Sequence, residues 1–215
     1  MLKNYPVNLQ LKNKSAVIVG GGVIAERKLL KLLETEANIT IVSPGLTEKI
    51  RNLAREKKVC WEKKLFSKGD LSKAFLVIAA TSSKQVNREV FESCHEHQLI
   101  NVVDDPKLSN FILPSTLHRG KLSIAVSTSG ASPSLAKKII SELSEQFDDT
   151  YEDYLDFLGH SRVKIQVEIE DPAVRWRILQ KLLEKEFLQL SRNNDREQRQ
   201  KRFEELLQSE WESEL

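Results

Sequence analysis

The chain has 215 residues, of which 40% are hydrophobic and 30% are charged, and its formal net charge at pH 7 is +2. This charge is too small for the dense basic surface that is typical of nucleic-acid-binding proteins, so we expect no nucleic-acid partner. No run of about 18 apolar residues could span a bilayer, and residues 1–14 lack the apolar core of a signal peptide, so we expect a cytoplasmic protein without a membrane partner.

An apolar strand leads directly into three glycines and then into a helix, in the sequence AVIVGGGVIAERK at residues 16–28. This arrangement follows the G-x-G-x-x-A pattern of a dinucleotide-binding turn. Gly20 permits the tight turn, Gly22 lets the backbone approach a pyrophosphate, and Ala25 lets the helix pack closely on the strand. Because the N–H groups at the helix start face the phosphates, the sequence predicts cofactor binding at Gly20, Gly21 and Gly22.

Short apolar strands alternate with helical patterns through the first hundred residues. The expected strands are 16–19, 39–42, 59–61, 75–80 and 99–103, and the clearest expected helices are 26–36 and 85–97. Continuous apolar strands separated by helices indicate a parallel sheet covered on both faces, as in a Rossmann-like α/β fold. A ligand is then expected beyond the carboxyl ends of the strands, where the strand order reverses.

The end of the second strand bears on the choice between NAD and NADP. A dinucleotide fold that selects NAD usually has an acidic residue there, about 20 residues beyond the glycines, to bind the ribose 2′-OH. This chain instead has Ser43 followed by Pro44, with neither a carboxylate nor an arginine for a 2′-phosphate. Because no basic residue stands close by, we favour NAD. Thr81, after the fourth strand, is either a neighbour of the cofactor or a turn and capping residue.

Two adjacent carboxylates end the fifth strand, in the sequence NVVDDP at residues 101–106. At the carboxyl edge of the sheet either Asp104 or Asp105 could serve as a general base, because repulsion between adjacent acids raises their affinity for a proton. The alternative is structural, with Asp105 and Pro106 starting a turn that Asp104 caps. The local sequence leaves these two interpretations even.

The character of the sequence changes after Val103. Apolar stretches at 110–114 and 122–127 flank a turn-like His118-Arg119-Gly120, which predicts an antiparallel excursion away from the parallel sheet. From about residue 148 the chain reads as all-helical, with a break near 171–172 and with charged outer faces that are typical of solvent exposure.

A hydroxyl-rich loop, STSGASP at residues 127–133, separates the antiparallel segment from the first of these later helices. Ser132 can cap that helix and Pro133 suits its first position. An apolar stripe wide enough for a core or a dimer seam follows, formed by Leu135, Ile139, Ile140 and Leu143. The loop itself either binds carboxylate or phosphate groups or is a capped turn without a ligand.

Four ordered motifs in the first 150 residues resemble those of the precorrin-2 dehydrogenase family, which includes the N-terminal part of siroheme synthase. They are GGGVIAERK at 20–28, AAT at 79–81, NVVDDPKLSNFILPS at 101–115 and AVSTSGASPSLAK at 125–137. The resemblance implies an NAD-binding Rossmann domain over 1–113, a small α+β dimerisation region over 114–147 and a helical C-terminal domain over 148–215. Two subunits interlock in this family, so the resemblance also implies a homodimer.

The resemblance further implies the reaction, which is the NAD-dependent oxidation of precorrin-2 to sirohydrochlorin in sirohaem biosynthesis. Carried over by motif, Asp104 is the catalytic aspartate, Gly22 and Val23 contact NAD, and Ser43 with Pro44 flanks the adenosine end. A hydride leaves the reduced macrocycle for the nicotinamide while Asp104 removes a proton.

Precorrin-2 is an octacarboxylate tetrapyrrole, so its cleft needs cations and hydrogen-bond donors. The candidates are Arg119 of the expected hairpin and Ser127, Thr128 and Ser129 of the serine-rich loop, with Lys121, Lys137 and Lys138 nearby in sequence. Thr128 stands where the siroheme synthase pattern has a serine that can be phosphorylated, so we do not carry that modification over.

Two alternatives to a plain dehydrogenase stay open. Some family members also insert ferrous iron into the product, although no dedicated metal site is expected because the four histidines form no cluster with carboxylates. His95 and His97 fall on an expected helix, where residues two apart point away from each other. A non-catalytic NAD-sensing regulatory module would share the glycine turn, but it has no need of NVVDDP or the serine loop.

Overall fold

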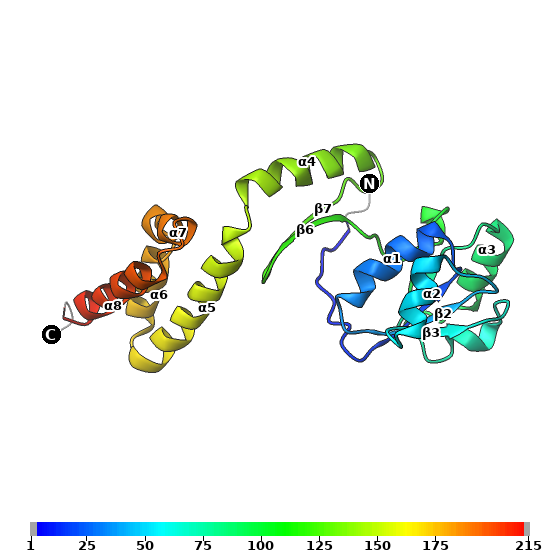
Figure 1. The fold of residues 1–215 in the computed structure, drawn as a ribbon, viewed down its shortest axis with the longest axis horizontal. Coiled ribbons are helices and arrows are strands. Elements are labelled where there is room, and N and C mark those ends of the chain that lie inside the picture. The colour runs from blue at the N-terminus through cyan, green and yellow to red at the C-terminus, as the bar shows by residue number, and fades with distance from the viewer. Residues whose placement is uncertain (1–3, 213–215) are drawn as a thin grey trace. The chain divides into compact units, whose positions relative to one another are not determined.

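The structure, a computed structural model, describes residues 4–212. The chain divides into two compact units, the first ending at Leu113 and the second beginning at Pro114. Figure 1 labels many of the elements of the two units, which are described separately below.

The first unit is built on a parallel five-stranded sheet with the order β3-β2-β1-β4-β5. Its strands are β1 (Ser15–Val19), β2 (Asn38–Val42), β3 (Cys60–Glu62), β4 (Leu76–Ala79) and β5 (Leu99–Val102). The strand order reverses between β1 and β4, so the crevice beyond their carboxyl ends is where a Rossmann-like fold binds its ligand. The Rossmann-like parallel sheet expected from the sequence is therefore confirmed.

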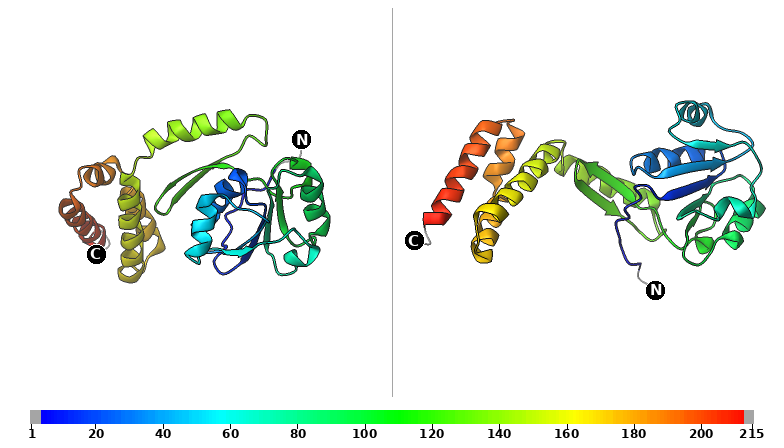
Figure 2. Two further views of the ribbon diagram at one scale, coloured as in Figure 1. Left: turned by 45° about the vertical axis from the view of Figure 1, so that its right-hand side comes forward. Right: turned by 90° about the horizontal axis from the view of Figure 1, so that it is seen from below.

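Helices cover both faces of this sheet. Side chains of α1 (Val23–Leu33) and α2 (Glu48–Arg55) pack with Ile18 of β1 on one face. On the other face, Val17 and Val19 pack with side chains of α3 (Lys84–Ser93) and the 3-10 helix η1 (Lys68–Leu71). Figures 1 and 2 show this layered arrangement, which explains why the strands are apolar on both sides.

The apolar stretch at 110–114 lies outside the antiparallel hairpin and is not a strand, because this segment runs beside β5 without forming a regular ladder. Asn110 Nδ2 donates to the Gln98 carbonyl at 2.8 Å, and Asn110 Oδ1 accepts from the Ile100 N–H at 2.8 Å. The side chain thus occupies hydrogen-bonding groups of β5 that a neighbouring backbone would otherwise use. The 3-10 helix η2 (Pro106–Leu108) precedes this segment, and the next strand begins only at Ser115.

The helix expected over 85–97 ends early, at Ser93, so His95 and His97 lie in the turn that follows it. Their rings stack with centroids 5.7 Å apart, and the expectation that they point apart on a helix is wrong. Gln98 fixes this turn from inside the protein, because its buried side chain accepts from the His95 N–H and donates to the Leu71 carbonyl.

The second unit begins with an antiparallel hairpin of β6 (Ser115–Arg119) and β7 (Leu122–Val126). Gly120 opens the two-residue turn with φ +53°, a left-handed conformation that favours glycine. Helix α4 (Pro133–Gln146) packs against both strands. Its expected start is confirmed, because the Ser132 hydroxyl accepts from the Leu135 N–H and Pro133 occupies the first turn.

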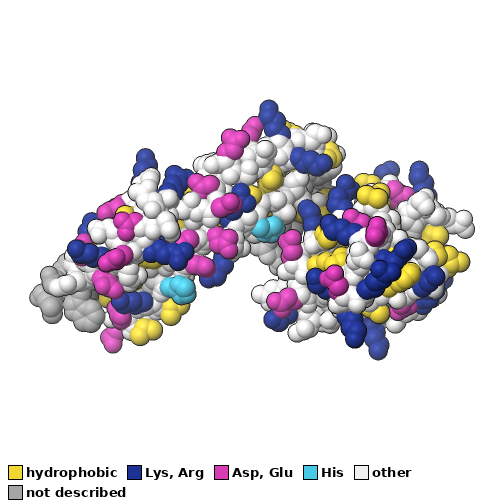
Figure 3. All heavy atoms as spheres, in the orientation of Figure 1, with side chains coloured by type: hydrophobic (Ala, Val, Ile, Leu, Met, Phe, Trp, Pro, Cys, Tyr) yellow, Lys and Arg dark blue, Asp and Glu magenta, His cyan; other side chains and the backbone are white. Residues whose placement is uncertain are grey.

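The helices that follow α4 in the described part of the chain pack together (Figure 2). They are α5 (Thr150–Glu168), α6 (Pro172–Lys181), α7 (Lys185–Arg192) and α8 (Arg196–Glu212). Their shared core is aromatic, with the Phe157 ring stacked on Phe187 and meeting the edge of Phe203. Acidic and basic side chains are interspersed on the visible face in Figure 3. Across residues 4–212, no helix combines the length and the hydropathy needed to cross a bilayer.

Candidate functional site

The glycine turn lies at the switch point of the sheet, between the carboxyl ends of β2 and β4. Gly20 has φ +118°, and a Cβ at this position would lie 2.4 Å from the Ala80 carbonyl oxygen. The Gly20 N–H donates to the Val42 carbonyl at 2.9 Å. Both the backbone conformation and the close approach to Ala80 therefore require glycine.

Gly21 lies against the loop that follows β2. A Cβ on Gly21 would lie 2.1 Å from the Gly45 carbonyl oxygen, and the Thr47 N–H donates to the Gly21 carbonyl at 2.9 Å. Thr47 also caps α2 and donates its hydroxyl to Glu26 on α1 at 2.6 Å. The role of Gly21 in the structure is thus to let the two loops at this edge of the sheet touch.

Gly22 is the glycine that faces open space. Nothing lies within 4 Å of a Cβ built there, and Gly22 is the N-cap of α1 without any side-chain capping bond. The first N–H groups of a helix have no partner within the helix and carry its positive dipole end. Val23, the next residue, is 76% exposed. The turn therefore has the open approach and the donors that a dinucleotide pyrophosphate needs.

Ser43 is buried at the end of β2, and its hydroxyl is used within its own loop. Ser43 Oγ donates to the Gly45 carbonyl at 2.7 Å, while the Trp61 indole N–H donates to the Ser43 carbonyl at 2.9 Å. Pro44 is exposed at the same edge. These bonds make the loop rigid, and contact of Ser43 and Pro44 with an adenosine stays a prediction.

Thr81 follows β4 and forms the turn that leads to α3. Its hydroxyl accepts from the Ser83 N–H at 3.2 Å, and it lies within donating distance of both the Ser83 carbonyl and Asn87 Oδ1. The turn interpretation of Thr81 therefore accounts for its side chain. Its backbone nitrogen lies 3.1 Å from the position of a Cβ on Gly20, which places Thr81 beside the glycine turn.

The two adjacent acids after β5 have different surroundings. Asp105 is the N-cap of η2 and accepts from the Lys107 N–H at 3.0 Å, so it is the acid that forms the turn. Asp104 is exposed and receives one hydrogen bond, at 2.8 Å, from Asn87 Nδ2 to its Oδ1. The other oxygen of Asp104 has no partner among residues 4–212. Of the two acids, Asp104 is the one whose carboxylate is open to a substrate.

Asn87 is the residue of this site that the sequence patterns missed. It lies on α3 and is only 1% exposed, and the apolar Val90, one turn later on the same helix, is also buried. A polar residue flanked by inward-facing apolar residues was the available signal. Asn87 connects the Thr81 turn to Asp104, so it belongs to the same site.

The predicted substrate-binding residues lie in the second unit, at opposite ends of the hairpin. Arg119 pairs with Leu122 next to the turn, whereas Ser115 pairs with Val126, which directly precedes the serine-rich loop. Four residues of extended strand separate these ends by about 13 Å. Within one chain, Arg119 and the loop therefore do not form a single cluster.

Arg119 is held by the junction between α4 and α5. Its Nε lies 3.0 Å from Asp149 Oδ1 and donates to the Phe147 carbonyl at 3.2 Å. In the loop, the Thr128 hydroxyl accepts from the Ser132 N–H and the Ser127 hydroxyl accepts from the Ser129 N–H. These contacts account for the local folding of both segments, and their binding of substrate stays a prediction.

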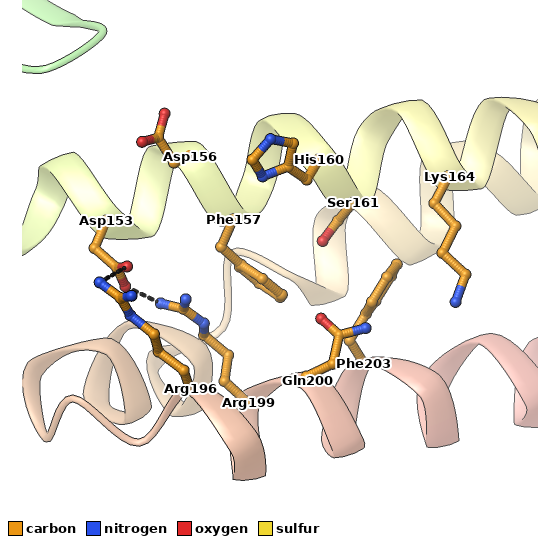
Figure 4. Close-up of a pocket in the computed structure, with 10 residues that line it drawn as sticks. All are labelled: Asp153, Asp156, Phe157, His160, Ser161, Lys164, Arg196, Arg199, Gln200 and Phe203. Atoms are coloured by element: carbon orange, nitrogen blue, oxygen red, sulfur yellow. Dashed lines mark hydrogen bonds and ion pairs between the residues drawn. The ribbon is translucent and has the colours of Figure 1, made fainter.

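A separate cleft of about 430 Å³ lies between α5 and α8 in the second unit (Figure 4). Arg196 and Arg199 both pair with Asp153, and the Arg199 guanidinium lies 4.5 Å from the centroid of the Phe157 ring. Arg199 is 5% exposed and also donates to Ser191 on α7. This arrangement joins three helices, and we interpret it as structural.

Within the described part of the chain, no group of three or more His, Cys, Asp and Glu is arranged to hold a metal ion.

Comparisons with known families assign most of the chain. A family model for NAD(P)-binding domains matches residues 7–115. A model described as the central part of a sirohaem biosynthesis protein matches 119–143, and a model of the SirC C-terminal domain matches 151–203.

Individual relatives agree with these families. The chain is 38% identical over 146 residues to a precorrin-2 dehydrogenase of Bacillus subtilis strain 168, an alignment that covers 68% of this chain and 90% of that protein. A siroheme synthase of Mannheimia succiniciproducens is 32% identical over 93% of this chain, which spans only 42% of that longer protein. A solved structure named SirC, precorrin-2 dehydrogenase, superposes with a TM-score of 0.79 at 30% identity, covering 92% of this chain and 100% of the other.

Proposed function

The chain belongs to the precorrin-2 dehydrogenase family, and from this premise we propose how its residues carry out the reaction. The protein is an oxidoreductase of sirohaem biosynthesis that oxidises precorrin-2 to sirohydrochlorin with a nicotinamide nucleotide. The bound nucleotide supplies the hydride acceptor. One molecule of precorrin-2 and one oxidised nucleotide give sirohydrochlorin, one reduced nucleotide and one proton, so the chain must bind both molecules and accept that proton.

Gly22 and the start of α1 hold the nucleotide pyrophosphate, and Asp104 accepts the proton. The observation that supports Asp104 is its carboxylate at the carboxyl edge of the sheet, with one oxygen anchored by Asn87 and the other free. A general base needs a fixed position and an accessible lone pair, and Asp104 has both. Asp105 lacks this freedom because it caps η2.

Replacement of Asp104 tests the assignment, and Asp105 provides a matched control. We expect Asp104→Asn to lower kcat for sirohydrochlorin formation by at least about 100-fold, because a general base contributes 10²–10⁴-fold. NADH binding and thermal unfolding should stay close to those of the wild-type protein. Asp105→Asn removes the same charge one residue away and should retain most of the activity. Equal losses in the two variants would contradict the role of Asp104.

NAD rather than NADP is the proposed cofactor. No basic side chain follows β2 directly, where Ser43, Pro44 and Gly45 stand, so a 2′-phosphate has no adjacent cation. Lys63, after the neighbouring β3, lies over the Trp61 ring with its ammonium 5.9 Å from the centroid. The test is kcat/KM for the two nucleotides with anaerobically generated precorrin-2, and a preference for NADP would reverse the proposal.

Because the reaction consumes a nicotinamide nucleotide, we place it in the cytoplasm.

We further propose which residues bind the carboxylates of precorrin-2, and that the protein acts as a homodimer. Arg119 and the residues Ser127, Thr128 and Ser129 remain the proposed contacts for the carboxylates of precorrin-2. Because these residues lie at opposite ends of the hairpin in one chain, two copies of the hairpin in a homodimer could supply them together. Arg119→Gln and Ser127→Ala should each raise KM for precorrin-2 with little change in KM for NAD.

A second candidate function follows from the relatives named siroheme synthase, which align with as much as 99% of this chain. Sirohaem contains iron, so such a protein needs ferrous iron inserted into sirohydrochlorin as well as the oxidation. The test is conversion of sirohydrochlorin with ferrous iron, without NAD, above the uncatalysed rate. Loss of this conversion in Asp104→Asn would assign it to the same site, and no conversion by the wild-type protein would leave the dehydrogenase alone.

A further inference from the structure

We propose that Asn87 is the positioning residue of the reaction, which fixes Asp104 relative to the nucleotide-binding turn. The inference rests on the proposed function, since it concerns the base assigned there. The observation that carries it is a buried amide that bonds to the backbone of Thr81 through both its oxygen and its nitrogen, and whose nitrogen also donates to Asp104.

The Asn87 amide has only one orientation that satisfies its neighbours. Asn87 Oδ1 accepts from the Thr81 N–H at 3.1 Å, while Asn87 Nδ2 donates to the Thr81 carbonyl at 3.2 Å. The Thr81 N–H can only donate and its carbonyl can only accept, so a flipped amide would face donor with donor and acceptor with acceptor. The second Nδ2 hydrogen must therefore point toward Asp104, where it donates at 2.8 Å.

All hydrogen-bonding capacity of this buried side chain is used. Both Nδ2 hydrogens have acceptors, Oδ1 accepts from Thr81, and Asn87 is 1% exposed. Its backbone is equally fixed, because its N–H donates to the Ser83 carbonyl at 3.0 Å in the first turn of α3. A buried, fully satisfied polar group holds one arrangement rather than several. Asn87 is therefore a rigid support for an otherwise exposed carboxylate.

The support is continuous from the glycine turn to the base. Gly20 approaches the peptide group between Ala80 and Thr81 so closely that no Cβ fits there, and the N–H of that same peptide group donates to Asn87 Oδ1. Asn87 in turn donates to Asp104, which completes this series of contacts. Because the glycine turn binds the nucleotide, Asn87 relates the position of the base to that of the cofactor. Misplacement of a catalytic group by about 1 Å can cost about 100-fold in rate.

A nearly isosteric substitution, Asn87→Asp, separates positioning from folding. The retained oxygen Oδ1 can still accept from the Thr81 N–H, but the oxygen that replaces Nδ2 faces Asp104 and the Thr81 carbonyl as an acceptor in place of a donor. Two carboxylates at hydrogen-bond distance cannot both be charged without cost, so one retains a proton to higher pH. We expect the acid limb of the kcat profile to move upward by about one pH unit or more, with activity recovering at higher pH.

The groups that could produce such a shift without Asn87 are few. Asp105 is the adjacent carboxylate in the chain, and α3 carries Lys84 and Arg88 at exposed positions. Among residues 4–212, neither Lys84 nor Arg88 forms an ion pair with Asp104. The control is Asn52→Asp, which makes the same change at an exposed position of α2 and should leave the profile unchanged. An unshifted profile for Asn87→Asp in a folded protein would overturn the inference.

A second variant, Asn87→Ala, keeps the inference testable if the introduced carboxylate prevents folding. Here we expect kcat to fall by about 10- to 100-fold, because the base loses its support, while the Kd for NADH changes by less than about twofold. A merely structural role predicts a different pattern, in which NADH binding weakens as much as turnover. Turnover equal to that of the wild-type protein would also overturn the proposal.

A measurement without substrate distinguishes failure of this inference from failure of the proposed function. The ¹³C carboxyl resonance of Asp104, assigned by its absence from Asp104→Asn, is followed against pH in the free protein. Its titration midpoint should lie higher in Asn87→Asp than in the wild-type protein. A shifted midpoint without precorrin-2 turnover would contradict only the proposed function, and turnover without a shifted midpoint would contradict only the role of Asn87.

Discussion

Gly21 and Gly22, in the proposed nucleotide-binding turn, have different surroundings, and paired substitutions should separate their roles. In Gly21→Ala the new Cβ would meet the Gly45 carbonyl oxygen, which is backbone and has little freedom to move. We expect a loss of about 1–3 kcal/mol in the free energy of unfolding of the first unit, the usual cost of overpacking. Denaturant titration checks this value, and a wild-type midpoint would show that the loop after β2 can shift freely.

Gly22→Ala should instead affect the nucleotide. Nothing lies within 4 Å of the new Cβ, and Gly22 has an ordinary extended backbone, so the change in folding free energy should stay below about 1 kcal/mol. The methyl group would occupy the approach of the pyrophosphate, so the Kd for NADH should rise by about tenfold or more. Fluorescence titration measures it. Unchanged NADH affinity would move the pyrophosphate away from Gly22.

At the residue scale, the local pattern alone could not choose between the two adjacent acids, and only the family resemblance assigned the role of base to Asp104. Asp104 and Asp105 are equivalent in a linear pattern, and their roles separate only because Asp105 caps η2 while Asp104 meets Asn87. Asn87 was not predicted as a site residue, because the periodicity of a helix indicates which positions face inward. It does not indicate which side chains of other elements those positions contact. A contact between α3 and the end of β5 depends on tertiary structure.

At the scale of elements, the strands of the sheet were predictable because both of their faces are apolar. The predicted elements are wrong where a side chain takes the hydrogen-bonding position that a backbone group would otherwise have. Asn110 bonds to β5 with its amide, so an apolar segment that resembles a strand forms no ladder. Gln98 likewise accepts from the His95 N–H after α3 has ended. Such side-chain bonds compete with secondary structure, and their partners cannot be read from local periodicity.

We expect the stability of the second unit to depend on pH through Tyr154 of α5. Burial raises the pKa of Tyr154 to about 12, with a further rise from Tyr151 and an opposing effect of Arg199. Its hydroxyl donates to the Leu182 carbonyl at 2.7 Å, a bond that only the neutral form can make. Since the folded pKa is raised above the unfolded value of about 10, this contribution is complete below pH 10 and is lost as pH rises toward 12.

Comparison with Tyr154→Phe isolates this contribution from the titration of lysines. The variant loses the bond to Leu182, so it should be less stable than the wild-type protein at pH 8, by about 1 kcal/mol. Between pH 10 and 12 the difference should shrink or reverse, by about 1–3 kcal/mol, because only the wild-type protein must bury or neutralise a tyrosinate. Denaturant titrations followed by far-ultraviolet circular dichroism measure both values. If the free energies of unfolding of the two proteins changed in parallel between pH 8 and 12, the assignment to Tyr154 would be contradicted.

At the scale of the whole molecule, α4 presents an apolar surface that the other elements of the second unit leave uncovered. Leu135 is 49% exposed, and Ile139, Ile140 and Leu143 are only partly buried, although α4 packs on the hairpin through Ala136. A run of partly exposed apolar side chains along one helix is typical of an interface. This surface is our reason for placing the proposed homodimer contact at α4 and the hairpin.

A charge placed in this stripe should therefore separate the subunits. We expect the wild-type protein to sediment as a dimer of the 24.6 kDa chain, and Leu135→Lys to sediment largely as a monomer, because a buried unpaired ammonium is costly at an interface. Lys137→Ala, at an exposed position of the same helix, should remain dimeric. If substrate contacts come from both subunits, precorrin-2 oxidation by Leu135→Lys should fall along with its dimer fraction, while NADH binding at the first unit persists. A wild-type monomer that is fully active would contradict both the dimer and the shared substrate site.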